Sequence, residues 1–294
     1  MIDFSPKHDC WIRNDDGSLS RMDEPYFRSE KLAEGVWRIL SSGDYAYLLE
    51  GDEEALAIDC GYGAGNIREY MQTLTDKPVR FVANTHDHFD HTANNSYFEG
   101  AYMAEAGLLL ATVPFPSFEG IDFPTDYPRM IVHDGDIIPL KGREILCLLI
   151  PDHAAGSVAY LDRRSRILFS GDEFISNRKN LNFGLRSWKE KLEKLMKFRG
   201  DFDYMHAGGG EKDPELIPKM LEAAKIGLAT GGEPAPVGGG RPQPEFNEKG
   251  EKIYGRMAPH PEDTDHPPVG RAEDRRIARF EDVEIVFYKD RIND

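Results

Sequence analysis

The residue types most able to do chemistry gather in one short segment, Asn84-Thr85-His86-Asp87-His88-Phe89-Asp90-His91. Three imidazoles and a carboxylate fall within six positions of it, at His86, His88, Asp90 and His91. Imidazole and carboxylate are the ligands that Zn²⁺ and other first-row dications select. A single histidine is more often a structural or exposed residue, but packing gives no reason to crowd four such groups together. The segment therefore predicts a metal site.

The strand that must deliver this segment is the apolar run 79–84. Ahead of it, short apolar runs separated by turns predict a meander of strands. These runs are 36–40, 45–50 and 54–59. A helix is predicted between the meander and 79–84, because apolar residues recur at helical spacing at Ile67, Tyr70, Met71 and Leu74. This order of strand, helix and strand is typical of α/β units.

A second series of strand-like runs follows, at 130–140, 143–151, 157–162 and 166–172. Beyond it, Ser187 and Glu190 form the Ser-x-x-Glu pattern of a capping box, which predicts a helix from Ser187 that stops at Gly200. Another helix is expected to begin at Asp213-Pro214, since proline is favoured at the first helical position. Two meanders that each lead into helices predict two sheets packed face to face with helices outside, an α/β layered sandwich.

The character of the sequence changes after residue 228. Residues 230–245 are rich in Gly and Pro, and 258–276 are acidic with several prolines, so both are predicted to be loops. The last run, 282–290, alternates like a strand, and its apolar residues would be costly to expose. We therefore expect a main domain over 1–228 and an extension over 229–294 whose final strand packs on the same domain.

The whole chain is acidic: its 294 residues carry 36 Lys and Arg against 52 Asp and Glu, a formal net charge of −16. This charge repels nucleic-acid phosphates and anionic lipid, so no nucleic-acid partner is expected. The longest aliphatic run, 145–150, is far shorter than the roughly 20 residues that cross a bilayer, and no apolar signal region is evident, so no membrane association or export is expected. Three cysteines without disulfide or metal spacing indicate reduced thiols. We expect a cytoplasmic protein that acts on a small molecule, and a homo-oligomer stays open.

The spacing His-x-His-x-Asp-His resembles the signature of the metallo-β-lactamase superfamily, and further motifs of that family follow in its order. Asp59, at the end of a predicted strand, resembles the aspartate that supports the metal loop. His153 in PDHAAGS, Asp172 in LFSGDE and His206 in YMHAGGG resemble the later ligands. The resemblance covers more than half of the chain. It implies a four-layer αβ/βα sandwich, the metallo-β-lactamase fold, with the catalytic domain over 1–228.

The resemblance also implies two metal positions that share one carboxylate. The ligands would be His86, His88 and His153 for the first metal, and Asp90, His91 and His206 for the second, with Asp172 shared. Two zinc ions are expected, with iron or manganese as alternatives. In the carboxylate-bridged branch of the family, a hydroxide between the metals attacks a carbonyl group, and Asp90 or a metal-bound water handles the proton. Asp87 is not counted as a ligand.

Several features bear on the substrate. No cysteine stands in a ligand motif, unlike the secreted enzymes that destroy β-lactams, and His88 stands where the oxygen-reducing diiron branch carries glutamate. THDHFDHTAN resembles the motif of glyoxalase II-type thioesterases, while His-Phe-Asp-His also occurs in acyl-homoserine lactone lactonases. Lactonases often carry a tyrosine shortly after the bridging aspartate, where this chain has Phe174, and the basic pair that grips glutathione in glyoxalase II has only a loose counterpart. The expected activity is hydrolysis of a small ester, thioester, lactone or amide.

Two other functions stay open. One is a mononuclear iron enzyme of the persulfide dioxygenase kind, and the other is a non-catalytic protein that keeps the metal for structure, which would need only four closed ligands. The aromatic and proline-rich segment 113–129 is expected to be core or a wall of the substrate cleft, bordering the same opening as 230–245. Arg178 and Lys179 are interpreted as surface charges, with a substrate carboxylate as the alternative.

Overall fold

A computed structural model describes residues 11–13, 17–21, 27–41, 44–61, 65–111, 126–235, 245–250, 252–254 and 271–294. Most of the two segments predicted to border the opening, 113–129 and 230–245, lies outside these residues, as does Cys10. Cys60 and Cys147 are buried free thiols. In the part of the chain that the structure describes, no helix is long and apolar enough to cross a membrane.

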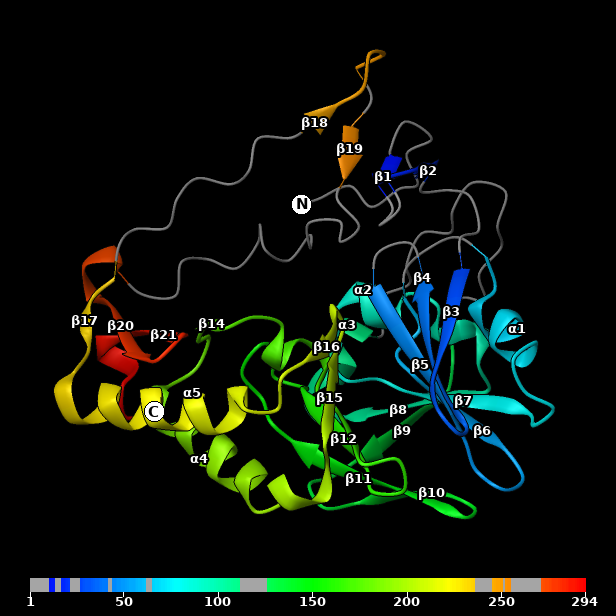
Figure 1. Cartoon of the computed structure of the whole chain (residues 1–294), viewed down its shortest axis with the longest axis horizontal. Coiled ribbons are helices and arrows are strands. Elements are labelled where there is room, and N and C mark those ends of the chain that lie inside the picture. Colours follow the sequence, from blue (N-terminus) through cyan, green and yellow to red (C-terminus); the bar gives the residue numbers. More distant parts are fainter. Residues whose placement is uncertain are drawn as a thin grey trace.

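The first sheet collects strands of the N-terminal half in sequence order, from β3 to β9 (Figure 1). They are β3 (Phe27–Ala33), β4 (Val36–Ser41), β5 (Asp44–Glu50), β6 (Ala55–Ile58), β7 (Val79–Ala83), β8 (Gly100–Ala104) and β9 (Arg129–Val132). Strands β3 to β6 are antiparallel neighbours, whereas β6 to β9 run parallel. The register pairs Ile58 with Ala83, so the carboxyl ends of β6 and β7 lie at the same edge. In sheets of this kind, ligands bind at that edge.

The second sheet has the order β10-β11-β12-β13-β15-β16. Its strands are β10 (Ile137–Leu140), β11 (Arg143–Leu149), β12 (Val158–Asp162), β13 (Ile167–Phe169), β15 (Tyr204–Ala207) and β16 (Gly210–Lys212). Most neighbours are antiparallel, but β13 and β15 are parallel, with Phe169 opposite His206. This pairing brings the segments that follow two distant strands to one end of the sheet.

The two sheets pack face to face, and helices cover their outer faces (Figure 1). These covering helices are α1 (Ile67–Gln72), α4 (Leu185–Met196) and α5 (Leu216–Thr230), whereas the short helices α2 (Phe89–Thr92) and α3 (Leu108–Ala111) follow β7 and β8 along the chain. Tyr47 and Phe169 belong to the apolar layer between the sheets. Met71 of α1 packs on the outer face of the first sheet, and Trp188 of α4 packs on that of the second. The predicted four-layer αβ/βα sandwich is confirmed.

A third sheet lies beside α5, in the order β14-β21-β20-β17 (Figure 1). Its strands are β14 (Arg178–Asn180), β17 (Glu233–Pro234), β20 (Arg275–Phe280) and β21 (Val283–Tyr288). Val283, Ile285 and Phe287 are buried in the same apolar cluster as α4 and α5. A small separate sheet contains β1 (Trp11–Arg13), β2 (Leu19–Arg21), β18 (Glu245–Phe246) and β19 (Lys252–Tyr254). The domain boundary after residue 228 stays a prediction; α5 itself continues to Thr230.

Helix α4 does not begin at the capping box. It begins at Leu185 with Gly184 as the N-cap, so Ser187 lies inside the first turn. The free N–H groups of that turn are bound by the end of the chain, because the Arg186 N–H donates to the carbonyl of Ile292 and the Ser187 N–H to that of Asp294. A cap supplied from more than 100 residues away replaces the local one. The helix also ends before Gly200, at Met196.

Two other predicted elements need correction. The run 130–140 is not one strand of the second meander, because β9 joins the first sheet beside β8 and β10 joins the second sheet. The turn between β9 and β10 is therefore the crossing from one sheet to the other. Helix α5 begins at Leu216 rather than at Asp213-Pro214, since the Asp213 carboxylate accepts the Glu215 N–H at 2.9 Å and closes a turn ahead of the helix.

Candidate metal centre

The first part of the site is the loop that leaves β7 and enters α2. His86 lies in this loop, His88 is the N-cap of α2, and Asp90 and His91 lie on α2 itself. All four side chains are buried. The rings of His86 and His91 lie 4.0 Å apart between centroids, and those of His86 and His88 lie 4.4 Å apart. One short segment thus places three imidazoles side by side, as the spacing predicts.

Asp59 fixes this loop from the end of β6. Its Oδ1 accepts the Thr85 N–H at 2.7 Å, and its Oδ2 accepts the Thr85 hydroxyl at 2.7 Å. The same Oδ2 lies 2.8 Å from Nδ1 of His91. Asp59 adopts a left-handed φ of 56°, which a short polar side chain tolerates better than most. The contact leaves Nε2 of His91 to face the other ligand candidates, the orientation that a carboxylate typically gives a metal-binding histidine.

The second part of the site comes from the facing sheet. His153 lies in the loop between β11 and β12, and its Nε2 is 2.9 Å from Nδ1 of His88. Its position is set by Glu173, whose Oε1 accepts the backbone N–H groups of Asp152 at 3.0 Å and His153 at 2.8 Å. Glu173 is buried. His153 is therefore held to Glu173 by its backbone and contacts the first loop through its ring.

Asp172 lies between the two parts, in the 3₁₀ turn η3 (Gly171–Phe174) after β13. Its Oδ1 is 3.6 Å from Nε2 of His91, and its Oδ2 is 3.8 Å from Nε2 of His153. Burial works against its ionisation, but His91 and His153 outweigh burial and lower the pKa of Asp172 to about 2. An ionised carboxylate that faces both halves is placed as a shared ligand would be.

Three sets of side chains in the described residues offer ligand atoms that all lie within 4.8 Å of one another. They are His86, His88 and His153; His86, His91 and Asp172; and Asp44, Asp90 and His91. Imidazole and carboxylate donors converging in this way suit a first-row dication. The described residues therefore include clusters that could hold metal ions.

The carboxylates of the cluster favour a positive charge among them. Burial disfavours a charged imidazole at His91, but the carboxylates of Asp90, Asp59 and Asp172 outweigh this and raise the pKa of His91 well above its ordinary value. His206 differs: burial and the nearby Arg38 lower its pKa to about 4, so its imidazole is neutral at pH 7, the form that binds metals. Its Nδ1 is buried without a hydrogen-bond partner among the described residues.

The sequence model of the metallo-beta-lactamase superfamily matches residues 43–209, which is more than half of the chain and contains every residue of these clusters. The chain belongs to the metallo-beta-lactamase superfamily. The chain is 29% identical over 182 residues to the acyl-coenzyme A thioesterase MBLAC2 of Gallus gallus, and the match covers 50% of this chain and 65% of that protein. The chain thus spans just under two thirds of the length of that relative.

Another similar protein is the 2,4-dinitroanisole O-demethylase subunit alpha of Nocardioides sp. (strain JS1661), 33% identical over 157 residues, which cover 51% of this chain and 47% of that subunit. Among solved structures, a metallo-beta-lactamase from Pontibacter korlensis superposes with a TM-score of 0.52 at 19% identity, covering 68% of this chain and 99% of the other. At that identity, the likeness supports the superfamily fold alone.

The structure brings most of the predicted ligands of this superfamily member together. His86, His88, Asp90, His91, His153 and Asp172 each belong to at least one of the three sets. His206 belongs to none of them, although it lies on β15, opposite Phe169 near the end of the paired strand β13. The segment after it lies against the cluster, because a Cβ built on Gly208 would be 2.5 Å from Oδ1 of Asp172. A side chain at position 208 would therefore displace the Asp172 carboxylate or the His91 ring. The ligand roles stay predictions.

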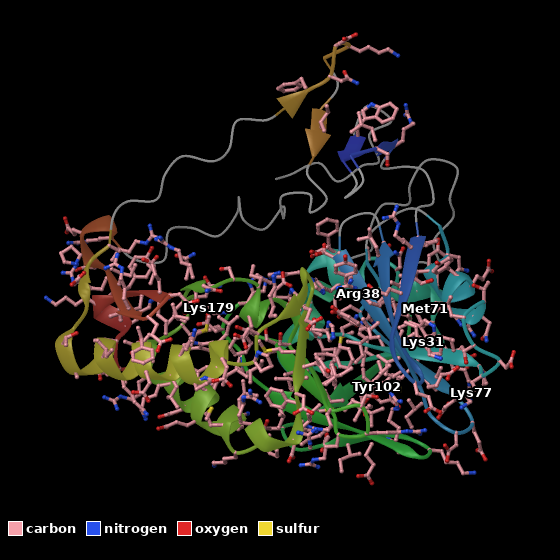
Figure 2. All side chains as sticks on the ribbon, viewed as in Figure 1. Lys31, Arg38, Met71, Lys77, Tyr102 and Lys179 are labelled. Carbon is pink, nitrogen blue, oxygen red and sulfur yellow. The ribbon has the colours of Figure 1, made fainter. Side chains whose placement is uncertain are left out.

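The interpretation of Lys179 as a surface charge is wrong. Its side chain, labelled in Figure 2, is buried. Its ammonium group pairs with Glu173 and lies 3.2 Å from Oδ2 of Asp152. It also lies 4.7 Å from the ring centroid of Trp188. Arg178, the preceding residue on β14, does lie in an exposed ion pair with Glu284. Alternation along a strand explains the difference, since neighbouring side chains point to opposite faces.

Three residues of the site region were not predicted from the sequence: Asp44, Asp152 and Glu173. Asp152 and Glu173 adjoin predicted ligands, so their neighbours His153 and Asp172 were the available signal. Asp44 lies in the segment SSGD, which reads as a turn, and has no motif around it. Only the pairing of β5 within the first sheet places its carboxylate beside Asp90 and His91.

Proposed function

We propose that the chain is a metal-dependent hydrolase that cleaves a small thioester with two metal ions, zinc by expectation. The observation that carries the proposal is the meeting of His86 and His88 from one sheet with His153 from the other, beside Asp172. A purely structural site would be closed by four ligands, whereas six of the seven predicted ligands belong to the three sets of side chains that meet here. The surplus of donors supports an open, reactive site.

In this proposal His86, His88 and His153 hold the first ion, Asp90, His91 and His206 hold the second, and Asp172 contacts both. The ions would supply a strong nucleophile from water near neutral pH and would polarise the carbonyl oxygen of the substrate. The side chains of the protein would carry out the remaining steps, including proton transfer. Asp90 is buried beside His91 and would take the proton from the attacking water.

Two buried carboxylates keep the donors in place. Asp59 holds His91 and the backbone of Thr85, and Glu173 holds the backbone of His153. Ordering the donors before the substrate arrives avoids reorganisation during the reaction. These contacts explain why the ring nitrogens face a common centre.

The choice of a thioester rests on the relatives, among which the MBLAC2 protein of Gallus gallus is named an acyl-coenzyme A thioesterase. The lactone alternative loses support from Phe174, which stands near where lactonases often carry a tyrosine. Its ring is fully buried and packs 5.6 Å from that of Trp188, so it faces the helical layer and offers no hydrogen-bond donor. We therefore place thioesters ahead of lactones.

The test is a substrate panel on protein whose metal content has been measured. It would contain a short acyl-coenzyme A, the matched oxygen ester, a lactone, an amide, a β-lactam and an aryl methyl ether, the last chosen for the O-demethylase relative. We expect the thioester to give the highest kcat/KM and chelation to abolish it, with activity restored by Zn²⁺. Loaded protein that cleaves the oxygen ester or lactone faster would overturn the thioester choice.

A second arm addresses the iron alternative. Protein loaded with Fe²⁺ would be given glutathione persulfide while dissolved oxygen is recorded. The proposal expects no oxygen uptake above the metal-free control. The variant His133→Ala serves as the control for loss of a histidine outside the site, because the His133 side chain is 74% exposed and contacts Asp136 in the same surface turn. Oxygen uptake by iron-loaded protein would replace the hydrolase with an oxygenase.

A further inference from the structure

Asp44 is a buried carboxylate beside the proposed second metal position, and no motif assigns it a role. It is the first residue of β5 and is 2% exposed. The next residue ties this strand end to the site, because the Tyr45 N–H donates to the carbonyl of Gly208 at 3.0 Å. The carboxylate is therefore held at the site by strand pairing on one side and by the segment after His206 on the other.

The geometry around Asp44 is that of a metal ligand. One oxygen of Asp44, one of Asp90 and one nitrogen of His91 all lie within 4.8 Å of one another. Oδ1 of Asp44 is buried and accepts no hydrogen bond from an N–H or hydroxyl group of the described residues, and the side chain meets the carboxyl group of Asp90. Buried carboxylates are ordinarily satisfied by hydrogen-bond donors, by an opposite charge or by a metal. Here the groups facing Asp44 include two further carboxylates, Asp90 and Asp172.

His91, the imidazole near Asp44, already contacts other carboxylates. His91 uses Nδ1 on Asp59, and its Nε2 lies 3.5 Å from Asp90 and 3.6 Å from Asp172. One imidazole cannot balance Asp44, Asp90 and Asp172 together, since like charges this close in a buried site repel strongly. A dication among them would compensate that repulsion and also complete the coordination of the oxygen on Asp44.

We propose that Asp44 is a further ligand of the second metal ion, and that it makes this position richer in carboxylate than the first. The inference deepens the proposed two-metal site and rests on it. The first position has three imidazoles and the shared Asp172, whereas the second would have Asp44, Asp90 and Asp172 with His91 and His206. Carboxylate-rich sites suit harder ions such as Mn²⁺, and imidazole-rich sites suit Zn²⁺. Asp44 therefore reduces the preference of the second position for zinc over manganese.

The experiment compares the native chain with Asp44→Asn, which keeps the shape of the side chain and removes its charge. Asp87→Asn is the matched control, because Asp87 is a buried aspartate of the same histidine motif but belongs to none of the three ligand sets. Metal-free proteins would be titrated calorimetrically with Zn²⁺ alone and with Mn²⁺ alone. Metal content after dialysis would be measured by mass spectrometry.

We expect Asp44→Asn to leave the first equivalent of Zn²⁺ unchanged and to weaken the second by at least about tenfold, with a larger loss for Mn²⁺. Asp87→Asn should bind both equivalents like the native chain. The melting temperature gives an independent readout: without metal, Asp44→Asn should melt at or above the native temperature, since repulsion is relieved, and its gain on adding metal should be smaller.

A second equivalent that binds Asp44→Asn as tightly as the native chain, with both ions, would overturn the inference. So would a metal-free variant that melts well below the native chain, because Asp44 would then serve the fold through hydrogen bonds. If Asp44→Asn does not fold, Asp44→Ser is titrated in its place. Native protein that binds two ions but cleaves no thioester would refute the proposed function and leave Asp44 as a ligand; native protein that binds one ion would refute the two-metal site and this inference together.

Discussion

Each half of the sandwich holds a predicted metal ligand through one buried carboxylate, and the two carboxylates are satisfied in different ways. In the first half, Asp59 bonds to Thr85 and His91, both of which lie in the loop that it positions. In the second half, Glu173 binds the backbone of His153 with one oxygen and pairs with Lys179 through the other. Lys179 comes from β14, which is not part of either facing sheet.

Because of this difference, the position of His153 in the second half depends on the C-terminal strands. Strand β14 pairs with β21, and the register sets Lys179 opposite Ile285. The same C-terminal region also caps α4 through the carbonyl groups of Ile292 and Asp294. The first half is organised by contacts within one βαβ unit, whereas the second requires a segment about 100 residues further along the chain. Substitutions that destabilise the C-terminal strands should therefore disturb the position of His153 more than that of His91.

The largest effect is expected where the halves meet, at Asp172. Asp172→Ala removes the carboxylate that faces both His91 and His153, so it should lower metal occupancy at the second position and reduce kcat by about 10³ to 10⁴. Metal content and steady-state kinetics on the thioester would be measured together. The exposed His133→Ala is the control and should keep both. Full activity with two ions bound would show that neither half depends on this carboxylate.

The next effect tests the dependence of the second half on Lys179. Lys179→Met leaves Glu173 and Asp152 buried without their cation, so the free energy of unfolding should fall by about 3–5 kcal/mol. Arg178→Met is the control on the adjacent residue of β14, whose exposed pair with Glu284 should contribute less than about 1 kcal/mol. Urea unfolding monitored by fluorescence measures both. Equal losses in the two variants would contradict the distinction between the faces of β14.

The sequence predicted the first half better than the second for a physical reason. His86, His88, Asp90 and His91 fall in one run, so their spacing alone indicates a metal site. His153, Asp172 and His206 stand singly at strand ends, and only the family resemblance connected them. Sequence proximity reports local contacts, whereas these three are brought to one end of a sheet by the pairing of β11, β12, β13 and β15.

The same limit explains the errors. The charge of Lys179 suggested a surface position, because the neighbouring sequence does not indicate that Glu173 and Asp152 pair with it in the core. Asp44 resembled a turn residue until β5 was placed beside α2. The layers of the fold were predictable from periodicity, since apolar faces must be buried whatever their partners. Which strand joins which sheet was not, and the run 130–140 was divided between two sheets.

A smaller effect is expected from removing the charge of either supporting carboxylate, Asp59 or Glu173. Asp59→Asn should weaken metal binding by about 10- to 100-fold, because His91 loses the partner that fixes its ring, while the His153 side of the site stays intact. Glu173→Gln should weaken it to a similar extent through the His153 backbone. Calorimetric titration with Zn²⁺ separates them: Asp59→Asn should affect the second equivalent, and Glu173→Gln the first. The opposite assignment would mean that the ions are shared differently between the halves.

The smallest effect is expected from a substitution in the C-terminal strand β21, and it tests whether side-chain packing there affects zinc binding. Ile285 is fully buried in the cluster that joins β21 to α4 and α5, and Ile285→Val removes one methyl-sized group there. The free energy of unfolding should fall by about 0.5–1.5 kcal/mol. Ile226→Val on α5 is the control, since that side chain is 38% exposed and the same change should have little effect. Because β14 and β21 are joined by backbone hydrogen bonds, Lys179 should keep its place in Ile285→Val, so the affinity for the first equivalent of Zn²⁺ should stay native. A loss of zinc affinity without a matching loss of stability would mean that side-chain packing under β21, rather than the strand ladder, holds Lys179 against Glu173.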